Sequence, residues 1–423
     1  MTTTTATTTT KNDDIEKTVI PRDTPILAAC RHLLQPNGSI VGSQVAAVVA
    51  QEFPTFLSAI GTKPSTVEHD DDQTTFSHPA LASIDGRVSL THQHVVDFSN
   101  TMGLALAQRG IGRGDRVALV LPNGPELALA LVAVAQWATA VPLNANGAVS
   151  ELEADLQRCG ARLVLGPGSL SGTTATHSSS MVHETKFHVP TAGTSSKDWS
   201  TTFAFVEETA AKLGIAYSAI IPSEREAGVF TLHDRADASM TGLASPEPNR
   251  HQDPALVLFT SGTTGQKKLV PHCMGDLLTA ATTIALSWNL TSADVNCNLM
   301  PLFHVGGIVR QIFSPLVSGG CVICCPSFDP SIFWALLQHD AFTWYYAAPT
   351  MHQLILQLGK AEGFVASDRT GSPHKLRMIA NAAGGLLPSL AEEMRDTFGA
   401  NVSAETFSLV RIYSTVSNDT HIF

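Results

Sequence analysis

The chain has 423 residues, of which 44% are hydrophobic and 15% are charged, and it carries a formal net charge of −11 at pH 7. This length predicts about two or three domains with a large buried core. The acidic balance without a basic run argues against nucleic acid as the main partner, and no apolar run approaches the ~20 residues of a membrane-spanning helix.

The first 77 residues are a low-complexity and extension segment that we expect to be partly disordered. Eight of the first ten residues are threonine, and no basic-then-apolar signal pattern follows. A transit peptide stays open as an alternative, although the threonine-rich start lacks arginine and soon becomes acidic. Apolar periodicity over 24–53 predicts a pair of helices. The C-terminal residues 420–423 are not a peroxisomal signal, so the sequence predicts a cytoplasmic protein.

From about residue 78, short apolar runs alternate with amphipathic runs. We expect strands at 80–84, 88–90, 116–121, 138–142 and 162–165. We expect helices at 91–109, 125–137 and 150–160, the last opened by a capping box at Ser150–Glu153. Strands that alternate with helices predict an α/β fold, in which mostly parallel sheets carry helices on both faces.

Residues 171–200 interrupt this alternation. Seven of the ten residues from 171 to 180 are serine or threonine, so we expect a surface insertion there. The alternation then resumes with a helix at 206–213 and a strand at 216–221, followed by a polar connector at 241–253.

A buried strand followed by a glycine-rich loop is predicted between residues 255 and 270. Hydroxyl, glycine and lysine residues follow the strand: Thr260, Ser261, Gly262, Thr263, Thr264, Gly265 and Lys268. The glycines let a ligand approach the backbone, and loop N–H groups, hydroxyls and a lysine can together bind phosphate. The spacing is not that of a Walker loop. A polar turn between two strands is the simpler alternative.

The alternation continues to the end of the chain. We expect strands at 298–300, 321–325, 343–347 and 375–381. We expect helices at 276–288, from 308, from 330, at 349–358 and from 388. Three of the seven cysteines lie in the run Cys321–Cys325, which is either a metal site or a buried strand. Because no second Cys-x-x-Cys pair exists, the buried strand is favoured. The total of seven cysteines is odd and their positions are scattered, which indicates a reducing compartment.

Two further segments follow predicted strands directly. His304 lies in the run Pro301–Gly307, and its residue type alone leaves a purely structural histidine open. The small residues Ala382–Gly385 come at the carboxyl end of a strand, where open α/β sheets bind ligands. A tight loop into the next helix is the alternative for this segment.

The run from Thr260 to Gly265, with Lys268, resembles the phosphate-binding signature of the adenylate-forming enzymes. That group includes acyl-CoA synthetases, luciferases and the adenylation domains of peptide synthetases. This chain departs from the pattern twice, with Lys267 where proline is usual and Leu269 where glycine is usual. We expect Lys267 to loosen the turn and add a charge, and Leu269 to reduce backbone freedom. Neither change removes a phosphate donor.

The resemblance implies the large N-terminal domain of such an enzyme over residues 78–400, with stacked βαβ-type subdomains and the insertion at about 171–200. It implies that His304 lines the acyl pocket near the carboxylate. It also implies that small residues hold the adenine ring: Ala383, Gly384 and Gly385. Segments 345–356 and 386–390 resemble the oxalate–CoA ligase branch, which handles a small dicarboxylate.

The resemblance ends near residue 400. The family continues with a strand, a Tyr-Gly-x-Thr-Glu segment whose glutamate holds Mg²⁺, and a C-terminal lid domain with a catalytic lysine. Residues 401–423 are instead a divergent tail without that glutamate. We therefore expect a truncated chain that lacks the lid domain, and a sheet edge left open after Gly399.

The expected function is ATP-dependent adenylation of a small carboxylic acid, followed by thioester formation with CoA and impaired by the truncation. The expected cofactors are ATP, Mg²⁺ and CoA, with no metal ligand from the protein and no nucleic-acid or membrane partner. Lys268 and His304 are the expected catalytic residues, and Thr260–Gly265 with Ala383–Gly385 the nucleotide-binding ones. The alternatives are a non-catalytic nucleotide- or acyl-binding pseudoenzyme, or a gene-model fragment.

Overall fold

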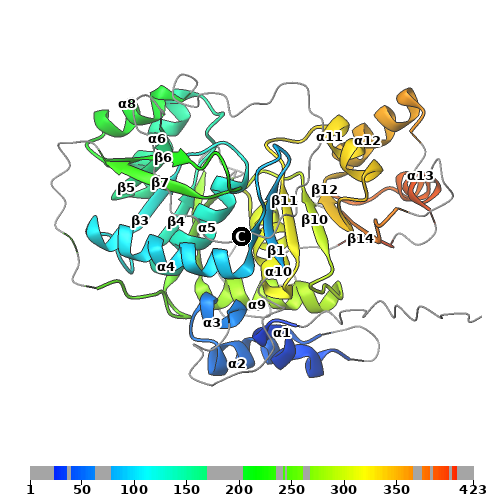
Figure 1. Cartoon of the computed structure of the whole chain (residues 1–423), viewed down its shortest axis with the longest axis horizontal. Helices are drawn as coiled ribbons and strands as arrows, with labels where there is room; N and C mark the ends of the chain where they lie inside the picture. The colour runs from blue at the N-terminus through cyan, green and yellow to red at the C-terminus, as the bar shows by residue number, and fades with distance from the viewer. Residues whose placement is uncertain are drawn as a thin grey trace, which may run out of the picture.

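The computed structural model describes residues 23–35, 40–61, 78–168, 203–234, 242, 245–260, 267–364, 374–381 and 384–399, and the backbone of 403–406. Two seven-stranded sheets lie side by side, each with helices packed against it (Figure 1). This confirms the predicted α/β fold with mostly parallel sheets. The expected insertion at 171–200 lies outside the described residues.

The first sheet has the strand order β7-β6-β5-β3-β4-β8-β9. Its strands are β3 (Arg116–Leu119), β4 (Thr139–Pro142), β5 (Leu163–Pro167), β6 (Ala216–Pro222), β7 (Phe230–Asp234), β8 (Pro254–Thr260) and β9 (Lys268–Cys273). The inner pairs are parallel, whereas β7 and β9 pair antiparallel to their neighbours. Strand β7 was not predicted, because an edge strand that is partly exposed lacks the continuous apolar run of a buried one.

The second sheet has the order β14-β13-β12-β10-β11-β1-β2. Its strands are β1 (Pro79–Ser83), β2 (Leu90–Thr91), β10 (Val295–Asn298), β11 (Cys321–Cys324), β12 (Trp344–Ala347), β13 (Met378–Asn381) and β14 (Ser403–Thr406). The expectation after Gly399 is wrong for the edge of β13, because β14 pairs with β13 in parallel, with Met378 opposite Ser403, and β14 is then the outermost strand of the described sheet. Strand β10 begins three residues earlier than predicted, since its two asparagines hide the apolar pattern.

Twelve α-helices are described: α1 (Pro25–Cys30), α2 (Gly42–Glu52), α3 (Phe56–Ile60), α4 (His92–Gln108), α5 (Pro125–Trp137), α6 (Val149–Cys159), α8 (Ala204–Lys212), α9 (Met274–Ser287), α10 (Ser314–Ser318), α11 (Pro330–Gln338), α12 (Pro349–Glu362) and α13 (Pro388–Phe398). A 3₁₀ turn, η1 (Arg31–Leu33), and a π-helix, η2 (Gly306–Phe313), complete the described set. Thr91 and Asp329 cap α4 and α11 through their side chains. The predicted capping box at Ser150 is wrong, because α6 begins at Val149 and Ala148 stands at its N-cap.

Helix α5 lies between the two sheets and contacts strands of both (Figure 1). It packs on β1 and β11 of the second sheet and on β3, β4 and β8 of the first. Every side chain from Leu127 to Ala135 is at most 1% exposed, so the helix is apolar on all sides. The two sheets therefore share one hydrophobic core around α5.

The N-terminal helices α1, α2 and α3 pack beneath α9 and α10 (Figure 1). Ile26 and Leu27 are fully buried, and the rings of Phe56 and Phe313 meet edge to face at 5.1 Å. The Thr24 hydroxyl donates a hydrogen bond to the carbonyl of Val317. These helices are therefore part of the main core, a role that the sequence did not indicate.

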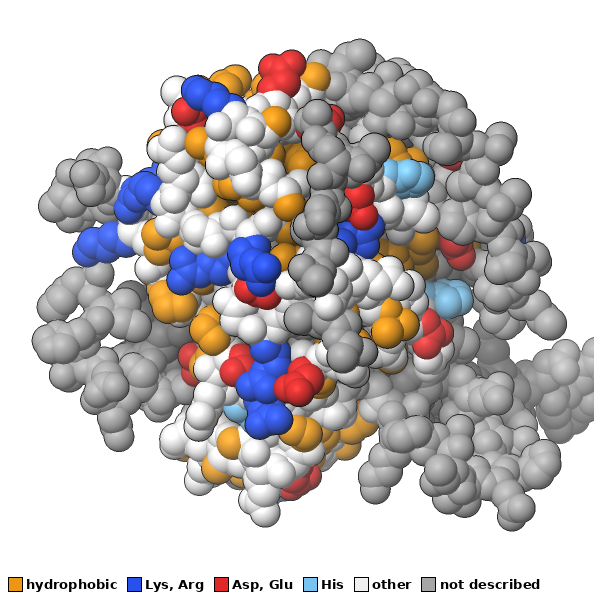
Figure 2. Space-filling model, turned by 90° about the vertical axis from the view of Figure 1, so that its left-hand side faces the viewer, with side chains coloured by type: hydrophobic (Ala, Val, Ile, Leu, Met, Phe, Trp, Pro, Cys, Tyr) orange, Lys and Arg blue, Asp and Glu red, His pale blue; other side chains and the backbone are white. Residues whose placement is uncertain are grey.

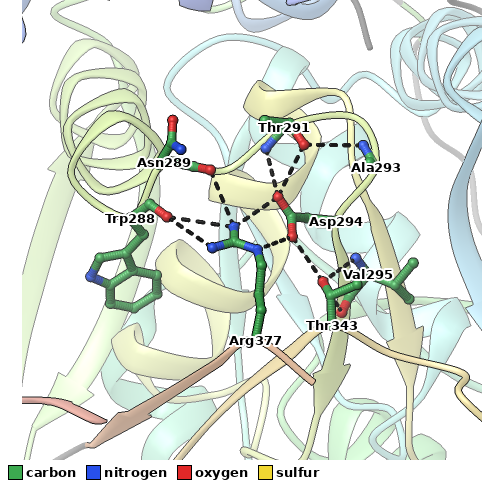
Figure 3. Close-up of polar contacts among 8 residues, drawn as sticks. All are labelled: Trp288, Asn289, Thr291, Ala293, Asp294, Val295, Thr343 and Arg377. Atoms are coloured by element: carbon green, nitrogen blue, oxygen red, sulfur yellow. Dashed lines mark hydrogen bonds and ion pairs between the residues drawn. The ribbon is translucent and has the colours of Figure 1, made fainter. Parts of the chain in front are cut away.

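A polar network fastens the amino-terminal ends of the second sheet's strands (Figure 3). Arg377, just before β13, donates from Nε and Nη2 to the Asp294 carboxylate at 2.6 and 2.8 Å. The Thr343 hydroxyl, just before β12, donates to the same carboxylate at 2.8 Å. Arg377 also donates to the carbonyl of Asn289 at 3.2 Å, at the end of α9. The network therefore holds the starts of β10, β12 and β13 against α9.

Charged side chains of both signs lie next to one another on the left-hand face of the molecule (Figure 2). The first sheet and its helices carry several arginine–carboxylate pairs. These are Arg109–Asp234 at 2.7 Å, Arg113–Asp253 at 2.9 Å and Arg162–Asp115 at 2.8 Å. Within the described residues, no helix is long and apolar enough to cross a membrane.

Candidate functional site

The loop predicted to bind phosphate connects the two strands of a β-hairpin. Strands β8 and β9 pair antiparallel, with Thr260 directly opposite Lys268 and Phe259 opposite Leu269. Val257 and Leu258 anchor β8 in the core, which confirms the predicted buried strand. Thr260 and Lys268 therefore face each other where the two strands meet the connecting loop. The other predicted loop residues lie outside the described part of the chain: Ser261, Gly262, Thr263, Thr264 and Gly265.

The remaining candidates follow strands of the second sheet. Strands β10, β12 and β13 run parallel, so the loops after them emerge at one edge. This edge is opposite the network of Asp294, Thr343 and Arg377. The sheet therefore presents its carboxyl-end loops together, as the sequence predicted.

His304 lies in the loop that joins β10 to the π-helix η2. Its N–H donates to the carbonyl of Pro301 at 3.3 Å, and its carbonyl accepts from the N–H of Ile308 at 3.1 Å. A Cβ atom on Gly307 would lie only 2.3 Å from the Pro301 carbonyl oxygen, so this turn requires glycine. Desolvation by the surrounding chain lowers the pKa of His304, which favours its neutral imidazole although the residue is exposed.

Gly384 and Gly385 are exposed in the loop after β13. The side-chain amide of Asn381 donates to the carbonyl of Gly384 at 2.6 Å and fixes the start of this loop. A Cβ atom on Gly384 would touch Pro349 at 3.5 Å, whereas one on Gly385 would meet nothing within 4 Å. Ala383, the third adenine-site candidate, lies outside the described residues.

Helix α9 links the hairpin to the second sheet. It begins at Met274, directly after β9, and is followed by Trp288. The Trp288 ring meets Trp344 edge to face at 5.4 Å and lies 6.3 Å from the ring of Tyr346. Both aromatic partners belong to β12, so one helix connects the candidate phosphate loop to the sheet that carries the other candidates.

The family described as AMP-binding enzyme matches residues 67–410. The chain belongs to this AMP-binding family. The match confirms the resemblance to the adenylate-forming enzymes. It also includes the hairpin, the His304 loop and the loop after β13.

Curated relatives of this AMP-binding chain are named as CoA ligases. An oxalate–CoA ligase of Arabidopsis thaliana is 30% identical over 76% of this chain and 55% of its own length. An oxalate–CoA ligase of Saccharomyces cerevisiae is 27% identical over 69% of this chain and 50% of its own length. A sulfoacetate–CoA ligase of Cupriavidus necator is 26% identical over 77% of this chain and 55% of its own length. The chain therefore spans about half the length of these relatives.

Solved structures show the same AMP-binding fold. The ATP-bound MatB of Rhodopseudomonas palustris aligns with a TM-score of 0.59 at 20% identity, over 83% of this chain and 59% of that one. The O-succinylbenzoate CoA synthetase of Bacillus subtilis in complex with AMP aligns with a TM-score of 0.55 at 20% identity, over 81% and 57% of the two chains. These similarities establish the architecture.

Asn123 connects the carboxyl ends of the two sheets in this AMP-binding chain. It follows β3 of the first sheet, and its amide donates to the carbonyl of Cys325 at 2.9 Å. Its side-chain oxygen accepts from the N–H of Leu302 at 2.9 Å, two residues before His304. The sequence alone does not indicate this role for Asn123, because its partners lie 179 and 202 residues away.

The π-helix η2 carries two buried polar side chains behind the His304 loop. The guanidinium of Arg310 lies 5.1 Å from the centre of the Tyr346 ring, and the Gln311 amide donates to the Tyr346 carbonyl at 2.9 Å. Burial raises the pKa of Tyr346, although the Arg310 charge opposes the shift. Single π-helical turns are often found at functional sites. The sequence signal that could have indicated this feature is the pair Arg310 and Gln311 within an otherwise apolar run.

The cysteines of β11 are packing residues. Strand β11 is fully buried from Cys321 to Cys324, as the buried-strand interpretation predicted, and burial raises the pKa of both thiols. Among the described residues, no group of three or more His, Cys, Asp or Glu side chains is placed to hold a metal ion.

Proposed function

We propose that this chain activates a small carboxylic acid with ATP and transfers the acyl group to CoA. A carboxylate oxygen attacks the α-phosphorus of ATP, and pyrophosphate leaves. The CoA thiolate then attacks the acyl carbonyl carbon, and AMP leaves. The observation that carries the proposal is the β8–β9 hairpin, which sets Thr260 opposite Lys268 at the ends of a glycine- and hydroxyl-rich loop within the family match.

The residues have separate roles in this proposal. Thr260–Gly265 cradle the terminal phosphates, and Lys268 offsets the charge that develops as pyrophosphate leaves. The neutral imidazole of His304 shapes the carboxylate end of the acyl pocket. Adenine lies against the small residues after β13: Ala383, Gly384 and Gly385. Mg²⁺ bound to the ATP phosphates would supply charge compensation there, beside Lys268.

The proposed substrate class is a small acid with a second anionic group. It is supported by the names of the relatives, which include oxalate–CoA and sulfoacetate–CoA ligases. The buried guanidinium of Arg310 behind the His304 loop is compatible with this class.

Exchange of labelled pyrophosphate into ATP tests the first half-reaction. The purified chain is incubated with ATP, Mg²⁺ and a panel of carboxylic acids that includes oxalate, malonate, sulfoacetate and a long-chain fatty acid. Exchange that depends on a small anionic acid supports the proposal. Binding of ATP without exchange for any acid would instead indicate a non-catalytic nucleotide-binding protein.

Replacing Lys268 by alanine is expected to weaken ATP binding by about 1.5–3 kcal/mol, the scale of a hydrogen bond to a charged group. Isothermal titration calorimetry on both forms measures the change. Lys360→Ala is the control, because it removes an exposed lysine paired with Glu393 at 2.8 Å. Equal ATP affinities of the Lys268→Ala variant and the parent chain would contradict the assigned role.

A further inference from the structure

Lys267 occupies the position where proline is usual in the phosphate signature, and the structure gives it a specific environment. Its ammonium group contacts Glu151 at 2.5 Å and Asp155 at 2.6 Å, both on helix α6. These carboxylates are four residues apart and so lie on one face of the helix. Lys267 is therefore held by α6, whereas the turn that it was expected to loosen lies outside the described residues.

The main chain of Lys267 is held from the same helix. Its carbonyl oxygen accepts a hydrogen bond from Nη2 of Arg158 at 2.5 Å. The charged groups of Lys267 and Arg158 both lie against the ring of Phe259, at 5.7 and 5.9 Å from its centre. Because Phe259 immediately precedes Thr260, these contacts reach both strands at the base of the loop.

Helix α6 is itself a fixed support. Leu152, Leu156 and Cys159 bury its apolar face in a core cluster, against which Phe259 and Leu269 of the hairpin also pack. Asp155 is only 7% exposed, so its charge requires a partner. Partial burial acts to lower the pKa of Lys267, but hydrogen bonds to Asp155 and Glu151 outweigh it and raise the pKa.

We propose that Lys267 is a positioning residue for ATP, and that its ion pairs with α6 fix the carboxyl end of the phosphate loop in place of a proline ring. Lys267 directly precedes Lys268, the residue assigned to the phosphates. A clamp on the side chain and carbonyl of Lys267 therefore limits the directions in which Lys268 can point. This inference rests on the proposed function.

The first test compares ATP binding by the full chain and two variants, using calorimetry. Lys267→Met keeps the length of the side chain but removes both ion pairs, and it is expected to weaken ATP binding about threefold to tenfold. Lys267→Arg keeps the charge and should retain most of the affinity. Lys212→Met is the matched control, because Lys212 pairs with Glu153 of the same helix at 2.8 Å and should leave ATP binding unchanged.

A second variant separates positioning from direct attraction between Lys267 and phosphate. Glu151→Gln removes one negative charge beside Lys267, at a side chain that is 44% exposed. If Lys267 acted directly on phosphate, this substitution would strengthen ATP binding. If Lys267 positions the loop, the substitution weakens binding by about twofold to threefold, with KM for the carboxylic acid unchanged.

The outcomes separate this inference from the function on which it rests. If the parent chain binds no ATP, both are overturned. If the parent chain binds ATP and either Lys267→Met matches it or Glu151→Gln binds ATP more tightly, the positioning role alone is wrong. Should Lys267→Met fail to fold, the exposed Glu151→Gln variant decides the question.

Discussion

Between pH 6.5 and pH 4 the protein is expected to lose about 6 kcal/mol of folding free energy through two buried histidines. His92 is 2% exposed and His352 is fully buried, and burial lowers the pKa of each from 6.5 to about 4. Below pH 6.5 the unfolded chain therefore binds protons that the folded chain excludes. Each shift corresponds to about 3 kcal/mol, which is present above pH 6.5 and lost as the pH falls to 4.

Burial keeps both rings neutral, and the local contacts do not offset it. His92 Nε2 lies 3.0 Å from the carbonyl oxygen of Gly320, and Nδ1 of His352 lies 3.1 Å from the hydroxyl of Tyr345. Neither contact supplies a negative charge that would stabilise an imidazolium. A total loss of about 6 kcal/mol is comparable with the whole stability of many proteins, so we expect unfolding near pH 4.

Urea denaturation at pH 7.5, 6.0, 5.0 and 4.5 measures how the free energy of unfolding depends on pH. His92→Gln and His352→Gln remove the titrating rings, so each variant should flatten the pH dependence by about half. His339→Gln, at an exposed position, should not change it. A slope that is identical in the parent chain and in both buried-site variants would show that other groups cause the acid sensitivity.

Replacing Asp294 by alanine is expected to destabilise the protein by about 3 kcal/mol. The carboxylate is 6% exposed and accepts hydrogen bonds from Arg377, Thr343 and Thr291. Removal of one partner from a buried ion pair costs about 3–5 kcal/mol. We take the lower value because Arg377 is 38% exposed and stays hydrated after its partner is lost.

Urea denaturation at pH 7.5 also checks this expectation. Asp294→Asn should destabilise the protein less than Asp294→Ala, because an amide oxygen in the place of Oδ2 can still accept from the N–H and hydroxyl of Thr291. Lys360→Ala, which removes an exposed ion pair, should lower the free energy of unfolding by less than about 1 kcal/mol. An Asp294→Ala variant no less stable than the Lys360→Ala control would mean that the network does not fasten the strands.

Much of the fold could be predicted from periodicity. The helix from Pro125 to Trp137 has the predicted bounds, because proline opens it and an apolar run continues to its end. Strands β7 and β14 were missed, since edge strands carry polar residues that the pattern assigns to loops. Pairing across a sheet depends on contacts between distant residues, which a local pattern does not contain.

In the candidate site, too, the local pattern predicts the elements but not the contacts between distant residues. The residue types of the hairpin loop predicted its place between two strands, and β8 and β9 confirm that arrangement. The neighbours of Lys267 could not be predicted, because Asp155 lies 112 residues earlier in the chain. Glu151 and Asp155 have helical spacing, which indicates that the two carboxylates share a cationic partner. The spacing does not identify that partner as Lys267.

Helix α5 has a consequence for the exchange of segments between related chains. Its side chains from Leu127 to Ala135 fill the space between two sheets, so their shapes must match strands that come both earlier and later in the sequence. A chimera joined after β4 would pair α5 from one parent with β8 and β11 from the other. Crossovers that keep β1, α5, β8 and β11 from a single parent should therefore give folded proteins more often than crossovers that separate them.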